Sequence, residues 1–111
     1  MLACPTLPAP RYFSWNAGLV HFIAISTEIY FTESPEVVKA QYDFVDSDLR
    51  AANQNRSSAP WIVVYGHRPL YCSCDGDCDG DATRVRNGIL FGNESANSSV
   101  LKYGMEELFY K

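Results

Sequence analysis

Two short apolar runs stand out along the chain, at residues 20–26 and 61–65. The second run shows no alternation of apolar and polar residues, which is typical of a strand that is buried on both faces. Gly66 then lets the backbone turn, and Pro69 prevents the strand from continuing. We therefore predict a strand over each run, with His67 just beyond the carboxyl end of the second strand.

A helical pattern lies between the two runs. Ser34 is a favourable N-cap, Pro35 suits the first helical position, and Glu36 places an acid in the positively polarised first turn. Apolar residues then follow at steps of four and three, and form one face that can pack on a sheet: Val38, Tyr42, Val45, Leu49 and Ala52. Charged residues lie largely on the opposite side, as in a solvated face: Asp43, Asp46, Asp48 and Arg50. The polar residues 53–58 end the helix.

This order of strand, helix and strand predicts an α/β fold built on a β-α-β unit, with parallel strands and a right-handed crossover. We expect His67 to follow a central parallel strand, beside the strand that ends near Thr27. After a long loop from Cys72, a second helix is predicted to begin at Ser99. Its apolar face would hold Leu101, Met105 and Leu108.

The position of His67 has two interpretations. Ligands and metals bind at the carboxyl ends of strands in open α/β sheets, and a neutral imidazole there can offer a lone pair to a metal. Alternatively, the histidine closes the junction between strand and loop with a hydrogen bond. Spacing alone favours the second interpretation. The chain has only one other histidine, His21, which lies within an apolar run.

Composition narrows the classes of function. With 111 residues, of which 47% are hydrophobic, the chain can form one modest core. Its net charge of −4 offers no basic field for nucleic acid or an anionic membrane. No apolar run approaches the roughly 20 residues that span a bilayer. The first residues do not resemble a signal peptide, because they lack a charged start and are interrupted by prolines.

Other features indicate the secretory route. N-x-[ST] sequons at Asn55, Asn93 and Asn97 are candidate glycosylation sites in polar stretches. Three of the four cysteines crowd into one segment: Cys72, Cys74 and Cys78. In an oxidising compartment a disulfide between Cys72 and Cys78 is plausible, with Cys74 as a competitor for either partner. Reduced thiols or a soft-metal site are the alternatives, although three cysteines do not complete a tetrahedral zinc site.

Residues 75–81 match the D-x-D-x-D-G opening of a calcium-binding loop, in which alternate residues supply oxygen ligands. Such a loop needs a bidentate glutamate at its twelfth position. Counted from Asp75, that position is Arg86, which is a cation. The favoured interpretation is a solvated acidic turn held by a disulfide, and weak calcium binding is the alternative.

Three segments of the chain, taken in order, carry a family resemblance: residues 12–28, residues 41–53 and the segment around His67. The last contains Val64-Tyr65-Gly66-His67, which has the form V-x-x-H. Together with residues 102–111, they resemble the purple acid phosphatases of the animal type, which are binuclear metallophosphoesterases. We therefore interpret residues 1–111 as part of a metallophosphoesterase catalytic domain that is family-like from about residue 12.

The resemblance implies an α/β sandwich that hydrolyses phosphate monoesters at a centre of iron plus a second divalent metal (iron, zinc or manganese). His67 would be a metal ligand. Of the family motifs D-x-G, G-D-x-x-Y, G-N-H-[DE], V-x-x-H and G-H-x-H, only V-x-x-H is present. We therefore expect this chain to be a fragment that is inactive in isolation, from a secreted or lysosomal parent whose substrate is a small phosphate ester.

The family's plant members use histidines after the V-x-x-H motif to bind and protonate the ester, whereas residues 72–87 contain none. Arg68 and Arg84 could contact phosphate, since guanidinium pairs with phosphate oxygens, but arginines beside a loop are more often surface residues. The alternative function is that of a non-catalytic secreted glycoprotein fragment with weak calcium binding through residues 75–81.

Overall fold

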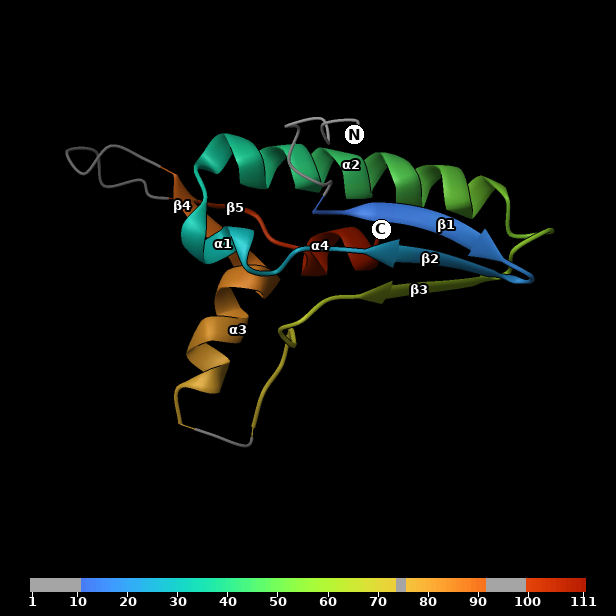
Figure 1. Ribbon diagram of the computed structural model, residues 1–111. Helices are drawn as coiled ribbons and strands as arrows, with labels where there is room; N and C mark the ends of the chain where they lie inside the picture. The colour runs from blue at the N-terminus through green and yellow to red at the C-terminus, as the bar shows by residue number, and fades with distance from the viewer. Residues whose placement is uncertain (1–10, 74–75, 92–99) are drawn as a thin grey trace, which may run out of the picture.

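The computed structural model describes residues 11–73, 76–91 and 100–111. A long helix, α2 (Pro35–Gln54), lies along one face of a three-stranded sheet (Figure 1). The sheet consists of β1 (Phe13–Ala17), β2 (Val20–Ala24) and β3 (Trp61–Tyr65). The other elements are α1 (Ile29–Thr32), α3 (Cys78–Asn87), β4 (Gly88–Phe91), β5 (Val100–Tyr103) and α4 (Glu106–Phe109). Helices combined with a sheet that contains parallel strands confirm the predicted α/β class.

The sheet contains the predicted pair of parallel strands. β2 and β3 are parallel neighbours, with Val20 opposite Trp61, and α2 connects them. The prediction that β3 is a central strand is wrong for the described residues, because the strand order β1-β2-β3 leaves β3 at the edge. The prediction also lacked β1, which pairs antiparallel with β2 in a tight hairpin. Gly18 has a φ of 58° in this turn, a conformation that favours glycine.

Helix α2 begins and ends where the sequence predicts. Ser34 precedes it in an extended conformation, and Pro35 is its first residue. Val38, Val45 and Ala52 are buried, and the other two residues of the predicted apolar face, Tyr42 and Leu49, are half-buried. This face packs on the sheet and forms the core with Ile23 of β2.

The face of the sheet turned away from α2 is apolar and uncovered by the described residues. Cross-strand pairing aligns its side chains in three rows: Phe13, Ala24 and Tyr65; Trp15, Phe22 and Val63; Ala17, Val20 and Trp61. The side chains of β3 in these rows are 67%, 42% and 44% exposed for Trp61, Val63 and Tyr65. The prediction that β3 is buried on both faces is therefore wrong for the described residues, because only its α2 side is covered.

The C-terminal third differs from the prediction. The long loop after Cys72 contains α3 and β4, and the helix predicted from Ser99 is instead strand β5, which pairs antiparallel with β4. Residues 100–103 pair with β4 instead of forming a helix, and Tyr103, at a φ of 70°, turns the backbone before Gly104. Within the described residues 100–111, only the short α4 is helical, and Met105 and Leu108 are buried with Val85 of α3.

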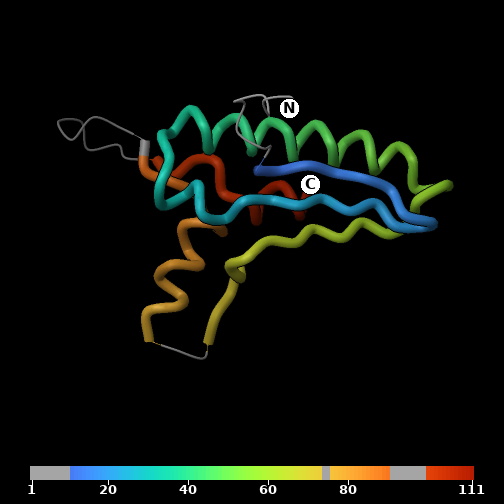
Figure 2. Tube along the Cα trace, in the orientation of Figure 1, coloured from blue at the N-terminus to red at the C-terminus, as the bar shows by residue number. Residues whose placement is uncertain are grey.

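The segment that follows β3 leaves the sheet, and α3 returns alongside it (Figure 2). Among the described residues, no helix has the length and apolar character needed to cross a membrane.

Candidate functional site

The chain after β2 and the chain after β3 lie in close contact at the carboxyl ends of the strands. The amide of Ile25 donates a hydrogen bond of 3.0 Å to the carbonyl oxygen of Tyr65, so the pairing continues past the strand ends. A Cβ placed on Gly66 would lie 3.0 Å from Cγ2 of Thr27 and 3.1 Å from Cγ1 of Ile25. Glycine at position 66 therefore allows the two segments to approach each other.

Buried polar side chains hold the segment between β2 and α1. Gln41 of α2 is fully buried. Its Oε1 accepts a hydrogen bond of 2.7 Å from the amide of Ser26, and its Nε2 donates one of 3.0 Å to the carbonyl oxygen of Ser26. Thr27 is also buried, and its Oγ1 accepts a hydrogen bond of 3.0 Å from the amide of Arg68. These bonds fix the backbone on both sides of the strand ends.

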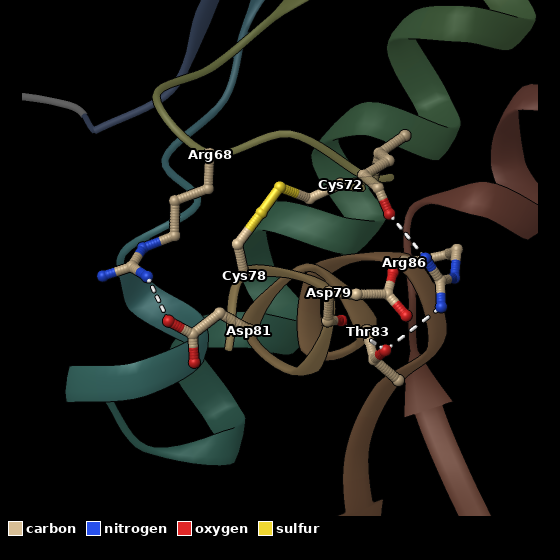
Figure 3. The surroundings of a disulfide bond; sticks show 8 residues. Arg68, Cys72, Cys78, Asp79, Asp81, Thr83 and Arg86 are labelled. Carbon is tan, nitrogen blue, oxygen red and sulfur yellow. Dashed lines mark hydrogen bonds and ion pairs between the residues drawn. A yellow bond between two sulfur atoms is a disulfide. The ribbon is translucent and has the colours of Figure 1, made fainter. Parts of the chain in front are cut away.

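The guanidinium of Arg68, which follows β3, contacts residues at the start of α1 and in α3. Its Nε and Nη2 donate to the two carboxylate oxygens of Glu28, at 2.7 and 3.2 Å. Its Nη1 donates to Asp81 of α3 at 3.0 Å, as Figure 3 shows. Its Cζ also lies 4.3 Å from the centre of the Phe31 ring in α1, within the range of a cation–π contact.

The same pairing affects the protonation of the two groups. The hydrogen bond from Arg68 is the main cause that lowers the pKa of Glu28, and the charges of Arg68 and His67 act in the same direction. The hydrogen bond with Glu28 raises the pKa of the Arg68 guanidinium. Both groups are therefore held in their charged forms.

His67 lies two residues beyond the end of β3, at the carboxyl end of a parallel strand, as predicted. Its side chain is exposed, while the amide of the next residue, Arg68, is bonded to the buried Thr27. The described residues contain no group of three or more histidine, cysteine, aspartate or glutamate side chains that could hold a metal ion. The described residues by themselves therefore do not form a binuclear centre around His67.

The two arginines considered as phosphate contacts have other neighbours in the structure. Arg68 is engaged with Glu28 and Asp81. The Cζ of Arg84 lies 5.3 Å from the centre of the Phe31 ring. These contacts give Arg68 a role within the fold that the sequence does not reveal.

Cys72 and Cys78 form a disulfide with their Cα atoms 5.7 Å apart (Figure 3). Cys78 is the first residue of α3, so the bond links the segment after β3 to this helix. The competing Cys74 and the isolated Cys4 lie outside the described residues, and so do the sequons at Asn93 and Asn97. The third sequon, at Asn55, is exposed at the end of α2.

Two acidic residues of the calcium-like segment lie in a helix rather than in a loop. Asp77 precedes α3, and Asp79 and Asp81 lie in its first turn, where acids are favourable. Asp79 and Asp81 pair with Arg86 and Arg68, respectively. The predicted turn is therefore wrong for Asp79 and Asp81, whose backbone is helical and whose carboxylates pair with arginines. Their exposure and the adjoining disulfide agree with the prediction. Asp75 lies outside the described residues.

A second polar cluster lies on the α2 side of the sheet, and the sequence analysis missed it. Nε2 of His21 lies 2.6 Å from Oδ2 of Asp48, and its Nδ1 lies 2.5 Å from Oδ1 of Asn16. The hydroxyl of Ser14 donates to Oδ1 of Asp48 at 2.8 Å, not to the histidine. The cluster is therefore a structural link between the hairpin and α2. Recognising β1 would have revealed it, because Asn16 is then opposite His21.

Comparison with known proteins identifies relatives of this chain. A human protein named acid phosphatase type 7 is 41% identical over 102 residues, which are 90% of this chain and 22% of that protein. The zebrafish (Danio rerio) protein of the same name is 38% identical over 105 residues, with 90% of this chain and 23% of the relative covered. The chain is related to the purple acid phosphatases. This confirms the resemblance to the animal type.

A plant relative matches a shorter part. The protein named probable inactive purple acid phosphatase 9 of Arabidopsis thaliana is 47% identical over 60 residues, or 54% of this chain and 8% of the relative. The chain thus spans about a fifth of the length of the animal relatives. No protein family model and no solved structure matches it.

Proposed function

We propose that this chain is part of the catalytic domain of an acid phosphatase that hydrolyses phosphate monoesters. The observation that carries the proposal is the position of His67, whose exposed imidazole follows a parallel strand and precedes the anchored Arg68. A V-x-x-H segment in a relative of the purple acid phosphatases is suited to present one ligand to a metal.

In the full reading frame, His67 would hold one metal of a centre that contains iron and a second divalent ion. Bound metals supply Lewis acidity and lower the pKa of bound water, which generates a nucleophile near neutral pH. This chain contributes the imidazole at a defined place and the framework behind it. The remaining ligands have to come from residues other than the described ones, which form no group that could hold a metal.

The uncovered face of the sheet supports the view that the chain is one part of a larger domain. Side chains of this face on β1 and β3 include four exposed large aromatics: Phe13, Trp15, Trp61 and Tyr65. Contiguous apolar surface of this kind usually packs against another element or a partner. The rest of the catalytic domain would provide that cover.

The test is an assay of p-nitrophenyl phosphate hydrolysis by two purified proteins, the isolated 111-residue chain and the product of the full reading frame. We expect metal-dependent turnover by the second protein and none at an enzymatic rate by the isolated chain. Turnover by the isolated chain would show that its residues suffice for catalysis. An inactive full-length protein with a full complement of metal would contradict the proposed phosphatase function.

A further inference from the structure

Arg68 follows the candidate metal ligand directly, and its contacts hold it more firmly than its neighbour. Its amide is bonded to the buried Thr27. Its side chain forms a two-pronged pair with Glu28, and it stacks on Phe31. The residue is therefore anchored at both its backbone and its side chain, whereas the imidazole of His67 is exposed.

Of the two carboxylate partners, Glu28 matters more. The pair with Glu28 has the planar fork geometry in which two N–H groups meet two oxygens, which adds geometric specificity. The pair with Asp81 has a single hydrogen bond, and the Asp81 side chain is 57% exposed. Exposed single pairs contribute little because water screens them. The Glu28 pair thus ties the start of α1 to the backbone of the His67 segment.

We propose that Arg68 is a positioning residue for His67, and that Glu28 is its essential partner. This inference rests on the proposed function, since it concerns the side chain assigned there as a metal ligand. The clamp of Glu28 and Arg68 fixes the backbone next to His67 against the segment that follows β2, so that the imidazole is presented from a rigid base. A guanidinium engaged in this way does not serve as a contact for the phosphate of the substrate.

The variants that test the clamp are Arg68→Lys, Glu28→Gln and the double variant, all made in the full reading frame. Lysine keeps the charge but loses the fork and the flat surface that stacks on Phe31. Arg50→Lys is the matched control, because Arg50 also pairs with a carboxylate, Asp46, but on the exposed surface of α2. Glu28→Gln changes few atoms, so it remains informative if Arg68→Lys does not fold.

Two measurements, Zn²⁺ affinity and hydrogen exchange, distinguish a positioning role from a general effect on folding. The affinity for Zn²⁺ alone should fall about 10- to 100-fold in each single variant, which is typical when a partner that orients a ligand is lost. The Zn²⁺ affinity of the double variant should be no lower than that of either single variant, since both substitutions remove the same interaction. Hydrogen exchange should accelerate in the peptide that contains residues 66–68 and stay unchanged in peptides from the middle of α2. The Arg50→Lys control should match the wild type in both Zn²⁺ affinity and hydrogen exchange.

Kinetics with p-nitrophenyl phosphate distinguish a positioning role from a direct contact between Arg68 and phosphate. A positioning role predicts a lower kcat with a KM close to that of the wild type. A raised KM and weaker inhibition by inorganic phosphate, with unchanged Zn²⁺ affinity, would show that Arg68 contacts phosphate and would overturn the inference. Unchanged Zn²⁺ affinity together with unchanged hydrogen exchange at residues 66–68 would also overturn the inference. If the wild type binds Zn²⁺ in a way that depends on Arg68 but has no phosphatase activity, the proposed function fails and the clamp stands.

Discussion

Gln41 offers the sharpest test of how the segment after β2 is held in place. Replacement by Met preserves the size and apolar stem of the side chain but removes both hydrogen bonds to Ser26. Each such bond contributes about 1 kcal/mol net, and a polar group left without a partner costs about 1–3 kcal/mol. Since two backbone groups lose their partner and Ser26 is only half-buried, we expect a loss of about 2–3 kcal/mol in the free energy of unfolding.

The assay is urea unfolding of the 111-residue chain, followed by far-ultraviolet circular dichroism at low protein concentration. Gln54→Met is the matched control, because Gln54 is the exposed last residue of the same helix. Surface substitutions of this kind change the free energy by about 0.5 kcal/mol or less. The same unfolding midpoint and slope for Gln41→Met and the control would show that the two hydrogen bonds to Ser26 do not stabilise the fold.

Three further predictions concern other parts of the fold. The double variant Trp61→Thr, Val63→Thr should increase the monomer fraction of the isolated chain in sedimentation velocity, because it makes the uncovered face of the sheet more polar; an unchanged distribution would contradict this role of the face. Replacing both Cys72 and Cys78 by Ser should lower the free energy of unfolding by about 2 kcal/mol, the value expected for so short a loop, and a difference below about 0.5 kcal/mol would contradict it. Tyr30→Phe should cost about 1 kcal/mol at neutral pH, because the hydroxyl donates a hydrogen bond of 2.6 Å to the carbonyl oxygen of Tyr103. Burial raises the pKa of Tyr30 above its ordinary value of 10.0, so the protonated form favours the folded state. Stability should therefore fall in the wild type as the pH rises above about 10, and less so in Tyr30→Phe; parallel urea midpoints across this range would contradict the assignment.

Local signals in the sequence predict the centre of the fold. The cap and the proline at the start of α2, together with its apolar spacing, act over neighbouring residues and do not depend on distant contacts. The apolar runs locate β2 and β3, and the helix between them is long enough for the crossover that parallel pairing needs. The position of His67 follows from these elements alone.

The interactions behind His67 are not predictable in the same way, because they join residues that are far apart in the chain. Arg68 pairs with Glu28 across 40 positions, and nothing in either residue's neighbourhood indicates its partner. The same holds for the link between His21 and Asp48, which needs the register of an unpredicted hairpin. At β5 the local pattern was misleading. The spacing of its apolar residues predicted a helix, but pairing with β4 makes this segment a strand.

The assignment of His67 as a metal ligand is best tested by the metal content of the full-length protein and of its His67→Ala variant. Zinc and iron per chain would be determined by mass spectrometry after dialysis against a weak chelator, with circular dichroism to verify the fold. We predict that His67→Ala loses metal from one site while its fold is unchanged, because His67 is exposed and is not part of the hydrophobic core. Equal metal content in the two proteins would contradict the assignment of His67.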